Sequence, residues 1–196
     1  MKKPRKYCRH DWIWHSSNDF KDGEHWTCSK CGEVKFPSGF GIMIYLIGSL
    51  RNPEVLVIAG KLRAKGFEVF DDWYAAGPEA DDKWKEYEIE RGHSYVEALD
   101  GYPAEHVFSF DLHHLDRSEA TLLVLPAGRS GHLELGYSIG KGKPGYILLD
   151  TPDRWDVMYK FATKVTTELD EIIADLVVPT SRPPGFYPCD KHGNIL

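Results

Sequence analysis

The sequence contains no apolar run close to the roughly 18–20 residues that a membrane-spanning helix needs. Its basic N-terminus, residues 1–6, is followed by polar residues instead of the apolar segment of a secretory signal peptide. Without such a signal, the four cysteines among 196 residues indicate reduced thiols and not a disulfide scaffold. We therefore expect a cytoplasmic protein with no membrane partner.

The sequence also lacks an excess of positive charge. Its 24 Lys and Arg residues face 30 Asp and Glu residues, which gives a formal net charge of −6. A mildly acidic protein is a poor match for the phosphate backbone, so nucleic acid is not an expected partner. The hydrophobic share of 42% and the aromatic share of 13% exclude a disordered chain or a coiled coil.

Three common nucleotide-binding and hydrolase motifs are missing. There is no Gly-x-x-x-x-Gly-Lys-Ser/Thr loop, no Gly-x-Gly-x-x-Gly fingerprint and no Gly-x-Ser-x-Gly elbow. A P-loop nucleotidase, a dinucleotide-dependent enzyme and a serine hydrolase of the α/β-hydrolase kind therefore find no support. We expect no organic cofactor.

The composition changes near residue 40. Three of the four cysteines lie in the first 31 residues, and the turn-forming segment 36–41 reads as a linker. Beyond it, apolar runs alternate with amphipathic stretches, which predicts an α/β, Rossmann-like doubly wound parallel sheet. The predicted units are a module at 1–38, an α/β domain at 42–178 and a Pro-rich tail at 179–196. The expected strands are 42–47, 67–70, 121–125 and 145–149, and the expected helices are 53–65, 81–91, 94–99, 104–117, 130–141 and 168–176.

The N-terminal cysteines have the spacing of a zinc ribbon. The Cys-x-x-Cys-Gly turn at residues 28–32 brings two thiolates to one ion, and the Cys-x-His pair at residues 8–10 offers two more ligands. The predicted ligands of this structural Zn²⁺ are Cys8, His10, Cys28 and Cys31. His15 or His25 are alternatives to His10 as the fourth ligand. A redox-active pair or a cluster without metal are the competing interpretations.

A turn of small residues follows the first predicted strand of the α/β domain. Gly48 and Ser49 expose backbone N–H groups, and Arg51 stands beside them. Ligands of open α/β sheets bind at the carboxyl ends of the strands, where such a turn suits an anion such as phosphate. The sequence therefore indicates an anion site here.

A second glycine-rich turn follows the most apolar strand. Gly128, Arg129 and Ser130 lead into a helix whose first turn is expected to hold Glu134, so that an anion and a carboxylate meet at one helix N-terminus. On the preceding helix, Asp111 lies one turn before Leu115 and is expected to point inward with it. The adjacent His113 and His114 face different ways, and we expect both to be solvated.

These motifs together resemble one enzyme family. Tyr45-x-x-Gly-Ser-x-Arg, Asp111-Leu-x-x-Leu and Ser130-Gly-His-Leu-Glu-Leu-Gly-Tyr occur in this order within residues 42–175. They are similar to motifs of the nucleoside 2-deoxyribosyltransferase superfamily, including its branch of 2′-deoxynucleoside 5′-phosphate N-hydrolases. The resemblance implies a flavodoxin-like fold, a homodimer or higher oligomer with sites completed across subunits, and cleavage of N-glycosidic bonds at C1′ of a nucleoside or nucleotide.

The resemblance also implies roles for individual residues. Glu134 would be the nucleophile, Asp111 would supply or relay the proton to the departing base, and Tyr45 would orient Glu134. The 5′-phosphate would be held by Ser49, Arg51 and Ser130, in the loops that contain Gly48 and Gly128. Arg129 is expected to add a second cation, an inference from its charge alone and not from the resemblance. Arg51 favours a nucleotide over a free nucleoside, and hence hydrolysis over transfer to a second base.

Two parts of the chain depart from the family pattern. Residues 71–74, where the base pocket would begin, do not match it, and residues 77–102 form an insertion that would cover the site or build a different base pocket. The zinc module is not part of the usual family core. The base, the sugar and the choice between hydrolysis and transfer are left open. The alternatives are an NAD-type glycohydrolase and a non-catalytic nucleotide-sensing module.

Overall fold

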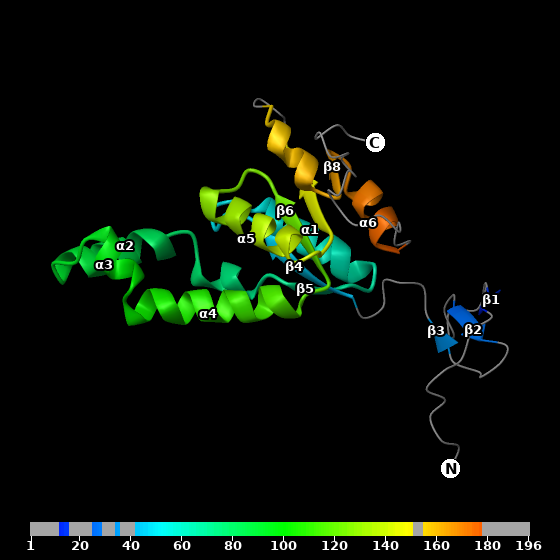
Figure 1. The fold of residues 1–196 in the computed structure, drawn as a ribbon, viewed down its shortest axis with the longest axis horizontal. Coiled ribbons are helices and arrows are strands. Elements are labelled where there is room, and N and C mark those ends of the chain that lie inside the picture. Colours follow the sequence, from blue (N-terminus) through cyan, green and yellow to red (C-terminus); the bar gives the residue numbers. More distant parts are fainter. Residues whose placement is uncertain (1–11, 16–24, 29–33, 36–41, 151–154, 178–196) are drawn as a thin grey trace, which may run out of the picture.

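The computed structural model describes residues 42–150 and 155–177 in full and, nearer the N-terminus, the backbone of three short strands. The larger sheet is parallel throughout, with the order β5-β4-β6-β7-β8 (Figure 1). Counted along this domain the order is 2-1-3-4-5, which is the flavodoxin-like arrangement. The expected α/β parallel sheet is therefore confirmed. Its strands are β4 (Met43–Ile47), β5 (Glu68–Phe70), β6 (Ala120–Val124), β7 (Gly145–Leu148) and β8 (Lys164–Thr166).

Helices cover both faces of this sheet. One layer consists of α1 and α6, and the other of α5 and the C-terminal part of α4 (Figure 1). Two 3₁₀ helices, η1 (Asp72–Ala76) and η2 (Val157–Phe161), were not expected from the sequence. The α-helices are α1 (Glu54–Ala64), α2 (Ala80–Glu90), α3 (Tyr95–Leu99), α4 (Tyr102–Arg117), α5 (Arg129–Gly140) and α6 (Leu169–Val177).

Strand β4 lies inside the sheet, between β5 and β6, and is buried on both faces. Ile44 and Leu46 pack toward α1 and α6, whereas Tyr45 and Ile47 pack toward α4 and α5. This alternation follows from the two-residue period of a strand, and burial of both faces explains why β4 is apolar throughout. A tyrosine in such a strand therefore needs a polar partner between the sheet and the helices.

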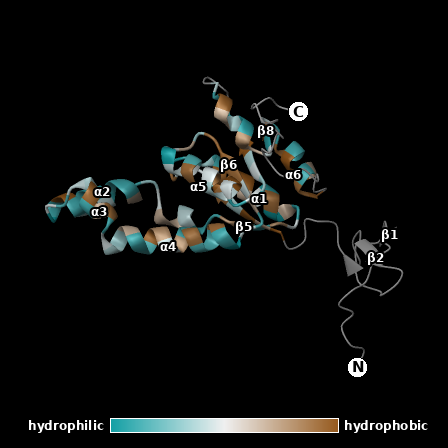
Figure 2. Cartoon of the chain, viewed as in Figure 1, coloured by the Kyte–Doolittle hydropathy of each residue, from teal (hydrophilic) through white to brown (hydrophobic). Residues whose placement is uncertain are grey.

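The insertion predicted between β5 and β6 forms an arm. Helices α2 and α3 lie at the end of α4 that is remote from the sheet (Figure 1). Along α4 only Leu115 is fully buried, while Val107 and Phe108 are about 60% exposed (59% and 61%). Figure 2 shows the resulting alternation of hydrophobic and hydrophilic bands along this helix. Only the C-terminal end of α4 thus belongs to the core.

The N-terminal strands form a separate antiparallel sheet in the order β1-β2-β3. Their bounds are β1 (Trp12–His15), β2 (His25–Cys28) and β3 (Val34–Lys35). The predicted tail at 179–196 and the linker at 36–41 lie outside the described residues. Among the helices that the structure describes, none is long and apolar enough to cross a membrane.

Candidate active site

Three of the predicted residues converge between the sheet and its second helical layer. Tyr45 comes from the middle of β4, Asp111 from α4 and Glu134 from α5. The hydroxyl of Tyr45 donates a hydrogen bond to the carboxylate of Glu134, and Asp111 is close enough to act electrostatically on both. Tyr45 is only 1% exposed, and burial, followed by the two carboxylates, raises its pKa far above the ordinary value. The phenol therefore stays protonated and serves as a hydrogen-bond donor.

Glu134 is a carboxyl group with an altered acidity. Burial, followed by the charge of Asp111, raises its pKa to about 7, although the hydrogen bond from Tyr45 opposes the change. The expectation that Glu134 lies in the first turn of its helix is wrong. Helix α5 begins at Arg129, and its first turn contains no acidic residue. Tyr45, and not the helix N-terminus, is therefore the donor that favours the ionised form of Glu134.

Asp111 points inward as expected. Burial raises its pKa to about 6, and its Oδ1 atom is buried with no hydrogen-bond partner among the described residues. Buried polar atoms are normally paired, so this unpaired carboxyl oxygen needs a partner from outside the described residues, such as an ordered water, a proton or a ligand. With pKa values so close, Asp111 and Glu134 titrate as a pair that holds one proton in the intermediate pH range.

His114 was predicted to be solvated, but its side chain packs against an aromatic residue of the core. Its ring stacks on Phe70 at a centroid distance of 3.9 Å, and Phe70 in turn lies 5.1 Å from the ring of Tyr45. Burial lowers the pKa of His114, followed by the nearby charges of Arg117 and His113, so the ring is neutral at pH 7. The signal for this placement was the spacing: position 114 is one turn from position 111, on the same side of the helix. His113 is exposed, as expected.

The first predicted anion loop lies at the carboxyl end of β4. A side chain at Gly48 would place its Cβ atom 2.5 Å from Val55 Cγ2, so the loop requires glycine to pack against α1. The hydroxyl of Ser49 accepts a hydrogen bond from the backbone N–H of Arg51 (3.2 Å). The guanidinium of Arg51 forms an exposed ion pair with Asp82 of α2 at 2.8 Å. Arg51, which was predicted to bind phosphate, is thus paired with a carboxylate of the arm.

The second predicted loop precedes α5, at the carboxyl end of the neighbouring strand β6. Gly128 is the N-cap of α5, and the predicted Arg129 and Ser130 follow it with exposed side chains. The buried Asn52 joins the two loops, because its Nδ2 donates to the carbonyl oxygen of Pro126 (3.3 Å) while its Oδ1 accepts from the N–H of Glu54 (3.1 Å). Asn52 was missed from the sequence, although Asn just before a helix is a capping signal.

The loops meet where a flavodoxin-like sheet binds its ligands. Strands β4 and β6 are neighbours whose connections leave in opposite directions, and the carboxyl ends of strands at such a switch point are where open α/β sheets generally bind ligands. His132 fixes the second loop, because its Nδ1 donates to the carbonyl oxygen of Gly128 (2.9 Å) and its Nε2 lies 3.0 Å from the hydroxyl of Tyr159. Gly131 permits the close approach of α5, since a Cβ atom there would lie 2.9 Å from Ile47 Cγ2.

Most of the predicted zinc ligands lie outside the described residues. Cys28 belongs to β2, of which only the backbone is described, and Cys8, His10 and Cys31 lie outside the described residues. In the described part of the chain, no group of three or more His, Cys, Asp or Glu side chains is arranged to hold a metal ion. The zinc site therefore stays a prediction from the spacing.

Comparisons with known proteins find little sequence similarity. No family model matches the chain, and no curated protein matches it. Among solved structures, the chain is similar to a 2-deoxyribosyltransferase from the psychrotolerant bacterium Bacillus psychrosaccharolyticus, with 19% identity, a TM-score of 0.47, and coverage of 74% of this chain and 99% of that chain.

Proposed function

We propose that the protein is an N-glycosidase that cleaves the bond between base and sugar in a nucleoside or a nucleoside 5′-monophosphate. The observation that carries the proposal is the buried pair Asp111 and Glu134, with Tyr45 donating to Glu134. Paired carboxyl groups with raised pKa values are suited to chemistry at an anomeric carbon, where one attacks and the other protonates the leaving group. The motif resemblance found in the sequence supports the same reaction.

In this mechanism the two carboxyl groups have different protonation states. The carboxylate of Glu134 attacks C1′ and forms a bond to it while the C1′–N bond breaks. The electron pair of that bond leaves with the base, which takes the proton of Asp111. Water, or a second base in a transfer reaction, then attacks C1′, releases Glu134 and returns a proton to Asp111.

The hydrogen bond from Tyr45 supports Glu134, and not Asp111, as the nucleophile. A donor aimed at a carboxylate favours its ionised form, so Tyr45 stabilises the arrangement in which Glu134 carries the negative charge. The pKa values of about 6 for Asp111 and about 7 for Glu134 leave the single proton mainly on Glu134 in the free protein, so the reacting arrangement is the less populated one. In the reacting arrangement Asp111 holds the proton, and its Oδ1 has no other partner among the described residues. The two loops place Ser49, Arg51 and Ser130 at the carboxyl ends of β4 and β6, where the anionic end of a nucleotide would bind.

The direct test is incubation of the purified protein with a panel of nucleosides, nucleoside monophosphates and NAD. Mass spectrometry then detects the free base and the sugar or sugar phosphate. Release of a base from a nucleoside or its monophosphate supports the proposal. Nicotinamide as the only product would replace it by an NAD glycohydrolase. Tight binding of nucleotides without any release would indicate a sensing module instead.

Changing Asp82 to Asn is expected to improve the use of phosphorylated substrates. The carboxylate of Asp82 neutralises Arg51 and repels a phosphate, and an exposed ion pair of this kind is worth up to about 1 kcal/mol. We expect KM for nucleoside 5′-monophosphates to fall by about fivefold, since about 1.4 kcal/mol corresponds to tenfold. KM for the matching nucleosides should stay the same. Asp81→Asn, on the same turn of α2, is the control; equal effects on both substrates would show that Arg51 does not bind phosphate.

We also propose that residues 1–38 hold one structural zinc ion. Elemental analysis of the full chain should find about one zinc per chain, and Cys31→Ser should remove most of it. Base release should change by less than about twofold, because the residues assigned to the reaction come from β4, α4 and α5. A full-length protein that contains no zinc after purification without chelators would contradict this proposal.

A further inference from the structure

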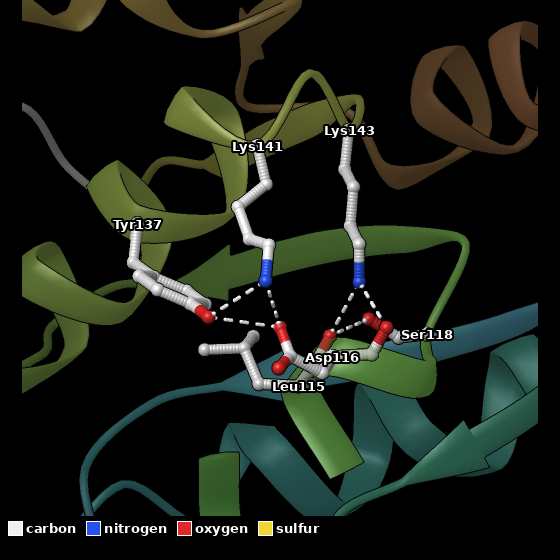
Figure 3. A network of polar contacts seen from close by, with 6 residues as sticks. All are labelled: Leu115, Asp116, Ser118, Tyr137, Lys141 and Lys143. Atoms are coloured by element: carbon white, nitrogen blue, oxygen red, sulfur yellow. Dashed lines mark hydrogen bonds and ion pairs between the residues drawn. The ribbon is translucent and has the colours of Figure 1, made fainter. Parts of the chain in front are cut away.

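A network of polar contacts joins the end of α4 to α5 (Figure 3). The carboxylate of Asp116, on α4, accepts hydrogen bonds from the hydroxyl of Tyr137 and from Nζ of Lys141, both at 2.9 Å. Lys141 Nζ also lies 3.0 Å from the Tyr137 hydroxyl. Asp116 and Lys141 are each more than 40% exposed, so the charge attraction alone is weak, but the contacts have a fixed geometry.

A second contact caps the C-terminus of α4. Nζ of Lys143 donates to the backbone carbonyl oxygens of Leu115 (2.7 Å) and Asp116 (2.6 Å), as Figure 3 shows. The hydroxyl of Ser118 donates to the same carbonyl of Leu115 at 2.8 Å. The last carbonyl groups of a helix lack partners within the helix, and a cation at this end is also favoured by the helix dipole. Lys143 therefore fixes both the position and the ending of α4.

Helix α4 needs such an attachment. It is 16 residues long, but its only fully buried residue is Leu115, because the first half extends into the arm. Asp111 lies one turn before Leu115 on this weakly buried helix, and Glu134 lies one turn before Ser138 on the firmly packed α5. Any tilt of α4 would therefore change the separation of the two carboxyl groups.

We infer that Asp116, Tyr137, Lys141 and Lys143 form a clamp that positions Asp111 opposite Glu134. Its members touch neither reacting group, so they are positioning residues and not catalytic residues. The catalytic consequence rests on the proposed function, whereas the structural consequence does not. An error of about 1 Å between reacting groups can cost about 10²-fold in rate, which is why a peripheral clamp affects the reaction.

The pKa of Glu134 provides a measurement that is independent of activity. The charged or titratable groups facing Glu134 are Tyr45 from β4 and Asp111 from α4. If α4 loosens, water enters between the helices, and the pKa values of both carboxyl groups fall toward their ordinary values. Loss of a lysine charge without any loosening has the opposite effect, because a carboxyl group that loses a nearby cation becomes a weaker acid.

The test is a carbon NMR titration of the Asp and Glu side-chain carboxyl groups in Lys143→Met and Tyr137→Phe, with resonances assigned through Glu134→Gln and Asp111→Asn. Both variants should lower the pKa of Glu134 by about half a unit or more, although one removes a cation and the other removes no charge. Lys143→Arg, which can still donate to both carbonyl groups, should restore the native value. Lys83→Met, at an exposed ion pair on α2, is the matched control and should leave it unchanged.

Kinetics then separate positioning from substrate binding. With a substrate that the native protein cleaves, kcat should fall by about tenfold in Lys143→Met and Tyr137→Phe while KM changes by less than about twofold. A pKa of Glu134 that stays the same or rises in Lys143→Met would overturn the clamp. Tyr137→Phe, the milder change, decides the question if Lys143→Met fails to fold. A protein without N-glycosidase activity would refute the proposed function, but the titration would still test the clamp.

Discussion

Replacing Glu134 by Gln is expected to abolish base release, with kcat/KM falling by about 10⁴-fold or more. Gln has almost the same shape as Glu but cannot form a covalent bond to C1′. The amide oxygen still accepts the hydrogen bond that the Tyr45 hydroxyl gives to Glu134 in the native protein. Any loss therefore reports the missing nucleophile and not a collapsed site. The measurement is the initial rate of base release by chromatography, with the best substrate from the panel.

The stability of this variant serves as its control. Glu134 has a pKa of about 7 in the folded protein and about 4.3 in an unfolded chain, so the folded state binds the proton more tightly. The stabilisation from this group is present below pH 4 and is lost as the pH rises through 7. At pH 8 the native protein must bury the charge of Glu134, which costs stability, whereas Gln is uncharged. Glu134→Gln should therefore unfold at an equal or higher denaturant concentration than the native protein at this pH. A folded variant that keeps more than about 1% of the native rate would exclude Glu134 as the nucleophile.

Replacing Asp111 by Asn should lower kcat/KM for natural substrates by about 10²- to 10⁴-fold, which is the usual contribution of a general acid. The reaction needs Glu134 ionised and Asp111 protonated. Below about pH 6 both groups hold protons and the nucleophile is lost, whereas above about pH 7 both are ionised and the acid is lost. The native enzyme should therefore show a narrow bell-shaped dependence of kcat/KM on pH, centred between these values.

The Asp111→Asn profile should have a different shape. The alkaline decrease disappears with the acid, and the acidic limb moves to lower pH because the charge of Asp111 no longer raises the pKa of Glu134. A nitrophenyl deoxyriboside, whose leaving group needs no proton, separates the two roles. Asp111→Asn should cleave it at nearly the native rate, whereas Glu134→Gln should not cleave it. Equal losses with both kinds of substrate would show that Asp111 is not the general acid.

The sheet could be predicted because its inner strands carry strong local signals. Strands β4 and β6 are buried on both faces, so their sequences are continuous apolar runs. Strand β8 has only three residues, at the edge of the sheet and none of them fully buried, so its short sequence carries no apolar run and no clear alternation. Its position is determined by pairing with β7, which a local pattern cannot reveal.

The candidate site also combines residues with a local sequence signal and residues placed only by contacts between distant segments. Short motifs singled out Tyr45, Asp111 and Glu134, and the structure brings these side chains together. The contacts that support them join distant parts of the chain: Asn52 reaches Pro126, and Lys143 reaches the end of α4. In the local sequence, Asn52 and Lys143 look like ordinary polar side chains. Only the folded structure shows which backbone carbonyl groups they bind.

The early position of β4 in the chain also determines when the site is completed during synthesis. Chains emerge from the ribosome N-terminus first, so β4, α1 and β5 can pair before the remaining strands exist. The face of β4 that carries Tyr45 is covered by Leu115 of α4 and Leu135 of α5, which are made much later. Until then the nascent chain presents Met43, Tyr45 and Ile47 to its surroundings. Holdase chaperones that recognise such apolar strands would therefore act on the strand whose Tyr45 later donates to Glu134.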